Sequence, residues 1–302
     1  MKKILKKATT GAFALITILG SAQTSQAQLN PLGSQYFQNQ YLANPAMAAT
    51  SEGLTLSGGL RKQWSMIPGS PVTGSLTGEY RLKEKVGIGM NLYNEEEGLI
   101  QRTRMVGTYA YHLPLNTGGQ SLHFGVSLGF ANERVMNENL NGDQGDQSVG
   151  RFNQRETFVD GDFGVAYTGN RLSVQAALPN LKSFFGTDEN NMVDRATFYS
   201  AVSYKWFFGA GLNGATLEPK AAMRGVKGYK NLFDAGANLT LINNQLILSG
   251  MYHSSESATF GIGVNYKNAL SILGMYTTET AALRGYTSGN FEVGVRYNFL
   301  KK

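Results

Sequence analysis

Few residues of this 302-residue chain are of a type and spacing that could do chemistry. His253 and Ser255 stand two apart, so on a strand they would share a face, as a general base and a nucleophile for acyl transfer must. That chemistry also needs a third group that orients the histidine, and the sequence identifies no such Asn or Asp. We therefore predict no catalytic residue and no enzymatic activity.

The other candidate sites would bind metal ions. Asn137 to Ser148 imitate part of a calcium-binding loop, but the last position is Ser148, where such a loop needs a glutamate that binds through both oxygens. His112 and His123, the remaining histidines, have no second ligand at metal spacing. The chain has no cysteine, which excludes disulfides and thiolate sites. We expect neither a metal nor a cofactor.

Residues 1–27 have the layout of a cleaved secretory signal. Lysines precede the apolar stretch Gly11–Gly20, which is too short to anchor a membrane helix, and small residues at Ser25 and Ala27 precede a cut between Ala27 and Gln28. The signal carries four lysines and no acid, so most of the net charge of +6 leaves with it. The excess of basic over acidic residues in the full chain therefore gives no support for nucleic-acid binding.

An alternation of apolar and polar residues along the chain predicts the β-strands that would position any site. From Phe291 to Phe299, "FEVGVRYNF", every second residue is aromatic or valine, so the segment predicts a strand with one apolar face. About 14 such segments occur, mostly of roughly 9–13 residues, which is the length that a tilted strand needs to cross a bilayer. The expected strands are 53–64, 71–82, 85–93, 99–112, 120–133, 157–168, 171–178, 195–207, 215–224, 232–242, 245–254, 257–267, 269–278 and 290–299.

The links between the expected strands differ in length. Most even-numbered links are short, whereas the odd-numbered links include 134–156, 179–194 and 279–289. Outer-membrane barrels have short periplasmic turns and longer external loops, and an even number of strands places both termini in the periplasm. We predict that residues 51–302 form an all-β, transmembrane antiparallel β-barrel in the outer membrane. The alternatives are a secreted β-sandwich and a solenoid.

Residues 28–50 precede the barrel and do not alternate. Pro31 and Pro45 interrupt any long helix. Glycines alternate with apolar residues in the strands, and small inward-facing positions leave room in a lumen for something that fills it. We expect residues 28–50 to form a plug or docking segment in the periplasmic half of the barrel; the alternative is a disordered leader. The residues expected to contact the barrel or a partner are Tyr36, Phe37, Asn39, Tyr41, Asn44 and Pro45.

Several short motifs follow one another along the chain. They are a Gln/Tyr/Asn-rich start, Asn44-Pro45-Ala46, Arg61-Lys62-Gln63-Trp64, Gly69-Ser70-Pro71, "ALPNL" (177–181), "LEPKAAMRGVKG" (217–228) and "FEVGVRYNF" (291–299). Together they resemble the PorP/SprF family of the Bacteroidota over nearly the whole chain after the signal. One departure is that Leu300, Lys301 and Lys302 follow Phe299, whereas many barrels end on the aromatic residue.

The resemblance implies a non-enzymatic outer-membrane barrel of the type IX secretion system. Such a protein would help to export or anchor a secreted surface partner of the adhesin or gliding type, which in several cases carries a dedicated C-terminal domain. It would work with other components of the secretion system and be surrounded by outer-membrane lipid. The partner could bind in the lumen or on the external loops. The alternative function is that of a diffusive channel or small-solute transporter.

Overall fold

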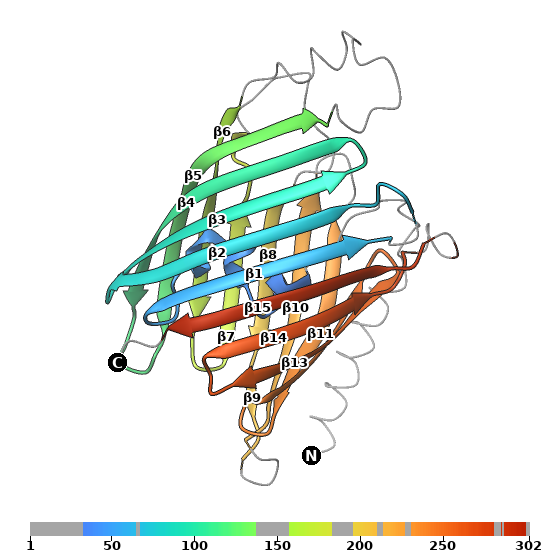
Figure 1. The fold of residues 1–302 in the computed structure, drawn as a ribbon. Helices are drawn as coiled ribbons and strands as arrows, with labels where there is room; N and C mark the ends of the chain where they lie inside the picture. The colour runs from blue at the N-terminus through green and yellow to red at the C-terminus, as the bar shows by residue number, and fades with distance from the viewer. Residues whose placement is uncertain are drawn as a thin grey trace, which may run out of the picture.

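The computed structural model describes residues 33–64, 67–136, 157–182, 196–209, 214–226, 231–280, 285 and 287–299. They form one antiparallel sheet that closes on itself as a barrel of tilted strands (Figure 1). The strands are β1 (Leu54–Gln63), β2 (Val72–Lys83), β3 (Val86–Glu97), β4 (Ile100–Pro114), β5 (Ser121–Val135), β6 (Phe158–Thr168), β7 (Leu172–Leu178), β8 (Ala196–Tyr204), β9 (Trp206–Phe207), β10 (Thr216–Val226), β11 (Leu232–Leu241), β12 (Leu246–His253), β13 (Ser257–Tyr266), β14 (Leu270–Thr277) and β15 (Asn290–Phe299).

The sheet closes where the first strand meets the last, with β1 and β15 paired from Leu54 opposite Phe299 to Gln63 opposite Asn290. Only Lys205 separates β8 from β9, and both strands pair with β10, so they share one position in the wall. The wall therefore has 14 strand positions, which confirms the predicted barrel.

The observed strands match the predicted ranges within a few residues. The largest extension is at β3, which was expected to end at residue 93 and continues to Glu97. Three consecutive glutamates end the apolar alternation there. The ladder nevertheless continues, because β3 stays paired with β4 as far as Glu97 opposite Ile100.

The two faces of the wall differ in polarity. On the outer face Leu128, Ile262 and Tyr266 are 65%, 63% and 62% exposed. On the inner face polar residues such as Gln63 and Thr77 are fully buried. An apolar outer band with a polar interior is the arrangement of a membrane barrel, in which the outer band meets lipid.

The two ends of the barrel are named here by their links. The turn end is where β1 begins and β15 ends, and it carries the links 84–85, 115–120, 169–171, 208–215, 242–245 and 267–269. The loop end carries the links 64–71, 98–99, 136–157, 179–195, 227–231, 254–256 and 278–289. At the turn end Lys267 and Asn268 both have positive φ, the geometry of the tight turn that best matches the twist of two antiparallel strands.

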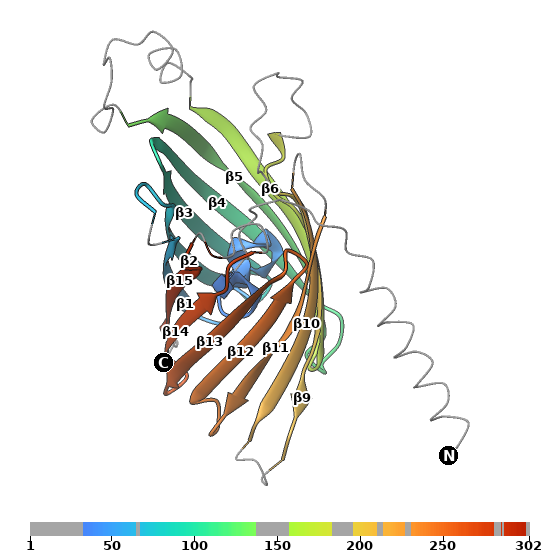
Figure 2. The same cartoon turned by 90° about the vertical axis from the view of Figure 1, so that its right-hand side faces the viewer.

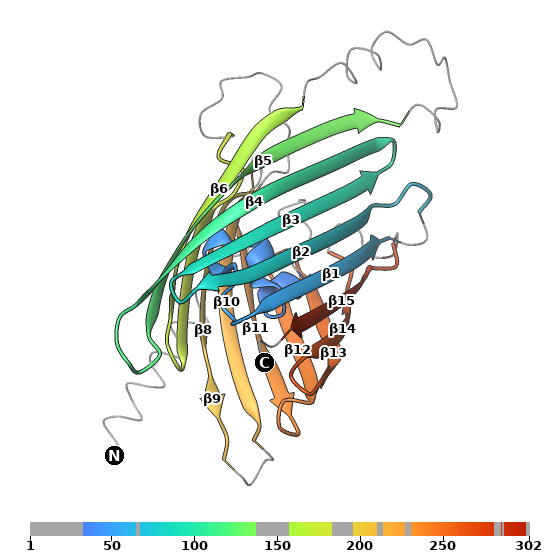
Figure 3. The ribbon, with the colours of Figure 1, turned by 60° about the vertical axis from the view of Figure 1, so that its left-hand side comes forward.

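The N-terminal segment lies inside the barrel. It forms three short 3₁₀ helices, η1 (Gly33–Tyr36), η2 (Gln40–Leu42) and η3 (Pro45–Met47), which the strands surround in all three views (Figures 1–3). No helix among the described residues is long and apolar enough to cross a membrane. Residues 33–50 are hereafter called the plug segment, for their position in the lumen.

Candidate functional site: the occupied lumen

The Asn-Pro-Ala element fixes the plug segment to one wall. The Oδ1 atom of Asn44 accepts a hydrogen bond of 2.9 Å from the N–H of Ala46 and so caps η3. Pro45 follows at the first helical position, where its missing N–H costs nothing. The Nδ2 atom of Asn44 donates to the carbonyls of Val165 and Ala176, at 3.2 and 3.4 Å. The amide of Asn44 is thus bonded on both sides while its side chain is fully buried.

Glycines on the wall make room for the plug segment. A Cβ added at Gly125 of β5 would collide with the backbone of Pro45 and Ala46. A Cβ added at Gly89 of β3 would lie 2.8 Å from the ring of Tyr41. At Gly125 and Gly89 the plug segment therefore lies directly against the wall. Any larger side chain at these positions would push the segment away.

Tyr41 and Asn39 bind strands that come earlier in the chain, β4 and β2. The Tyr41 hydroxyl shares a hydrogen bond of 2.6 Å with Thr108, which continues to Ser127 at 2.7 Å. Burial raises the pKa of the Tyr41 phenol, so the ring stays protonated and neutral. The Nδ2 atom of Asn39 donates to the hydroxyl of Thr77 at 3.1 Å.

Tyr36 forms the apolar centre of the occupied lumen. Its side chain is 1% exposed and its ring stacks on that of His253, with the centroids 5.9 Å apart. Phe37 is partly buried against the same cluster. The other members of the cluster are Ala177, Tyr199, Ala201, Ala222 and Met251. Aromatic burial of this kind is the largest apolar contribution that a short segment can make.

Charged wall residues hold the plug segment by its backbone. Lys220 donates to the carbonyl of Tyr36, and Arg296 donates to the carbonyl of Gln38 at 2.5 Å. Nearer the turn end, Glu79 accepts from the N–H of Ala49 at 2.7 Å, and Arg81 donates to the carbonyl of Thr50 at 2.8 Å. Hydrogen bonds in which one partner is charged contribute about 1.5–3 kcal/mol each.

The plug segment crosses the lumen obliquely. Thr50 bonds to Arg81, near the turn end of β2, whereas Gly33 lies against Arg61, near the loop end of β1. Gly33 favours glycine for two reasons. Its φ is +59°, and its surroundings leave no space for a Cβ. The sequence-based expectation confined the segment to one half of the barrel. Helix η1 extends beyond that half because its aromatic residue stacks on His253, the last residue of β12.

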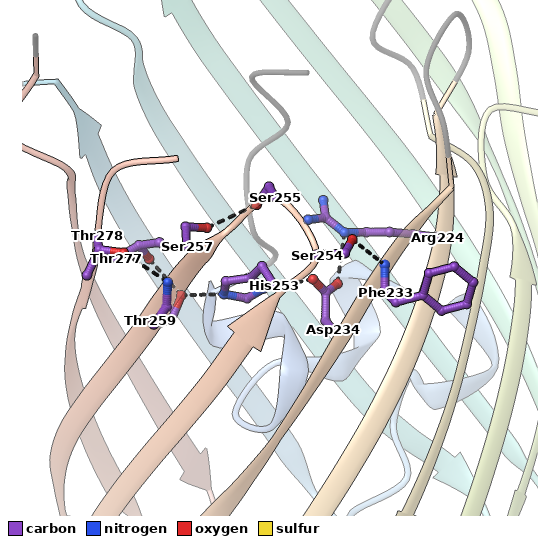
Figure 4. Close-up of polar contacts among 11 residues, drawn as sticks. Arg224, Phe233, Asp234, His253, Ser254, Ser255, Ser257, Thr259, Thr277 and Thr278 are labelled. Carbon is purple, nitrogen blue, oxygen red and sulfur yellow. Dashed lines mark hydrogen bonds and ion pairs between the residues drawn. The ribbon is translucent and has the colours of Figure 1, made fainter. Parts of the chain in front are cut away.

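His253 belongs to a buried polar chain that sequence reasoning missed (Figure 4). Its Nδ1 lies 2.7 Å from Asp234 and its Nε2 lies 2.8 Å from the hydroxyl of Thr259. Arg224 donates to the other oxygen of Asp234 at 3.0 Å. The orienting carboxylate that the sequence did not identify is therefore Asp234, which is opposite His253 in the register of β11 and β12. No spacing along the chain signals this pair.

Asp234, His253 and Thr259 have the order of an acyl-transfer triad, but the hydroxyl beside the histidine belongs to Thr259 and is only 3% exposed. Ser255, the candidate from spacing, bonds to Ser257 at 3.0 Å and not to His253 (Figure 4). The side chains of His253 and Asp234 are both 0% exposed. A substrate would need access to the hydroxyl beside the histidine. The buried network instead presents the His253 ring to the plug segment.

The other two histidines pair with each other. His112 and His123 are opposite each other on β4 and β5, with their Nδ1 atoms 2.6 Å apart, and the Nε2 of His123 lies 2.7 Å from the hydroxyl of Thr168. Within the described ranges, no three His, Cys, Asp or Glu residues gather as metal ligands. The calcium-like loop at 137–148 and the cut between Ala27 and Gln28 lie outside those ranges.

Near the loop end, ion pairs line the wall. Arg104 bonds to Asp162 at 2.7 Å, and Arg102 lies 3.1–3.2 Å from two glutamates, Glu95 and Glu97. Spacing along the chain does not reveal these pairs, because they join side chains on different strands: Arg102 on β4 to β3, and Arg104 on β4 to β6. The two arginines pair with five carboxylates in all, so the lumen near the loop end is polar with an excess of acidic groups.

The closed wall, its apolar outer face and its polar interior define the chain as an outer-membrane β-barrel. The chain belongs to the PorP/SprF family: the model described as type IX secretion system membrane protein PorP/SprF matches residues 25–297. This confirms the family that the motifs resemble, and with it the expectation of a non-enzymatic membrane protein.

Solved structures of similar fold are distant in sequence. The toluene transporter TodX of P. putida is 13% identical, covers 87% of this chain and 95% of its own, and has a TM-score of 0.50. The outer-membrane protein Omp33 of Acinetobacter baumannii is 9% identical, covers 82% of this chain and 98% of its own, and has a TM-score of 0.49. No curated protein sequence matches.

Proposed function

We propose that this barrel helps to export or anchor a secreted surface protein and that the plug segment is the part that couples the barrel to its partner. The observation that supports this most is the occupied lumen: Tyr36, Tyr41 and Asn44 are all buried between the plug segment and the wall. A barrel meant for free diffusion has no need of a segment bonded to its wall from several sides.

The partner is a secreted protein with a type IX C-terminal domain, of the adhesin or gliding type. The family supports this class of partner because its members belong to that secretion system. We further propose that the turn end faces the periplasm, since its links are mostly short, and that both termini lie on that side. Residues 28–50 then form a unit distinct from the barrel of residues 51–302, after a signal that is removed at Ala27.

The test is a deletion of residues 30–48 in the native host. The barrel wall pairs with itself, so the deletion variant is expected to keep its heat-modifiable migration on gels. The amount of secreted partner at the cell surface is expected to fall several-fold. A variant that folds and displays its partner at the wild-type level would make residues 28–50 a simple leader.

The second candidate function is transport of a small solute. It is favoured by the similarity to a protein whose title names it a toluene transporter, together with an apolar stretch of lumen wall at Met251, Leu273 and Met275. An uptake assay distinguishes small-solute transport from export or anchoring of a secreted protein. Vesicles that contain the purified barrel would take up a small polar solute that lipid excludes, such as glucose, faster than empty vesicles only if the transporter function holds.

A further inference from the structure

Three wall cations that bind the plug segment, Lys220, Arg296 and Arg81, form no ion pair within the described residues, and the first two bind the same short stretch, residues 36–38. The ion-paired arginines of the described wall are Arg61, Arg102, Arg104 and Arg224. Lys220 and Arg296 differ, because neither forms an ion pair with any described residue, and each donates to a carbonyl of the plug segment. The acids that interact electrostatically with these cations are shared with other groups: Glu218 bonds to Ser203 and lies 3.9 Å from Lys205, and Glu79 accepts from the N–H of Ala49.

An unpaired cation in this position is unusual on energetic grounds. Lys220 is only 3% exposed, and burying a charge is costly unless an opposite charge compensates for the lost water. The carbonyls of Tyr36 and Gln38 compensate in part. A carboxylate would do so better, because a hydrogen bond between two charged groups is shorter and stronger than one to a neutral carbonyl.

A small apolar cavity lies close to Lys220, on the far side of Phe37. Its walls come from both the plug segment and the barrel, and Lys220 Nζ lies 5.0 Å from the ring centre of Phe37 at its edge. The lining includes Tyr36, Phe37, Met251, Thr259, Leu273 and Met275. A cation beside an apolar cavity matches a ligand that carries a carboxylate next to an aromatic or aliphatic side chain.

We propose that Lys220 and Arg296 form a binding site for a peptide carboxylate, which the plug segment fills with its own carbonyls when no ligand is present. A chain end with a free carboxylate beside an apolar side chain competes with residues 36–38 and displaces them from the wall. The site deepens the proposed function, since the natural ligand would be a secreted partner. The binding of a synthetic peptide does not depend on that partner.

The test uses the full chain, purified in detergent, with Gln38→Cys as its only thiol, because the natural chain has no cysteine. This substitution keeps the carbonyl that Arg296 binds. The probe is the peptide Gly-Ser-Gly-Tyr-Phe, with either a free carboxylate or an amide at its C-terminus. We expect millimolar free-carboxylate peptide to raise the rate of labelling by a bulky maleimide by on the order of fivefold, and the amide to leave it unchanged.

Substitutions of the cations complete the test. In Lys220→Met the labelling rate is expected to become independent of the peptide, whereas Lys220→Arg retains the response. Lys267→Met, at a turn remote from the plug segment, is the control that loses a cation and keeps the response. Equal effects of carboxylate and amide, no effect of either, or a full response in Lys220→Met would each overturn the proposal. A carboxylate-specific response of the purified chain, together with wild-type partner display by cells that carry the 30–48 deletion, would count against the proposed function alone.

Discussion

At the scale of single residues, the lumen is organised by polar side chains that satisfy the backbone of the plug segment. Asn44 is the clearest case, because its amide makes one bond within the segment and two to the wall. A main chain with few regular hydrogen bonds of its own needs such partners when it is buried. The two bonds to the wall join residues more than 120 positions apart. Sequence spacing could therefore suggest that Asn44 caps a helix, but not which strands it binds.

Replacement of Asn44 by Ala should loosen the plug segment without unfolding the barrel. The change removes the cap of η3 and leaves two wall carbonyls without their donor, which costs about 2–3 kcal/mol locally. Proteolysis within residues 33–50 of the purified protein is expected to become faster by about tenfold or more. Asn116→Ala, in an exposed turn, is the matched control. Wild-type resistance to proteolysis in Asn44→Ala would show that the cap is dispensable.

The outer face offers a second residue-scale prediction. Val295 lies in the middle of β15 and is 39% exposed on the apolar outer face. Arginine there is expected to lower the stability of the barrel by about 2–4 kcal/mol if the position is near the bilayer midplane, and by less at Tyr297, closer to the turn end. Unfolding by urea in lipid vesicles measures both variants. Equal, small losses at the two positions would contradict the assignment of this band to lipid.

At the scale of elements, the strands could be predicted because the sequence of each strand alone distinguishes its apolar face from its polar face. The alternation in β15 or β13 is a local property, so period two finds the strand without knowledge of its neighbours. The plug segment has no such period, since three 3₁₀ helices follow one another with only three and two residues between them. The pairing of Asp234 with His253 depends on the register of two strands, which no single strand contains.

The fit between elements leads to a prediction at Gly89. Leucine there would overlap the ring of Tyr41 and push η2 off β3, whereas Gly74→Leu, with nothing within 4 Å of its Cβ, is the control. We expect Gly89→Leu to fold as a barrel but to expose the plug segment. The measure is maleimide labelling of Leu42→Cys, on η2, in each background. Slow labelling in Gly89→Leu, as in Gly74→Leu, would mean that η2 does not depend on this contact.

At the scale of the whole molecule, the barrel combines a conventional lipid-facing wall with a lumen that its own N-terminal segment occupies. The ion pairs near the loop end and the backbone bonds to Lys220 and Arg296 act on different parts of the lumen. The first group stabilises the wall and the second holds the plug segment. The parts that bind the plug segment can therefore be altered with the wall intact.

A plug segment that is bonded to the wall from several sides should also block the lumen, and conductance across planar lipid bilayers tests this most directly. The full chain is expected to show little stable conductance, whereas a variant that lacks residues 33–50 and retains heat-modifiable migration should form steady open channels. A full chain that conducted as strongly as the deletion variant would contradict a lumen filled by the plug segment.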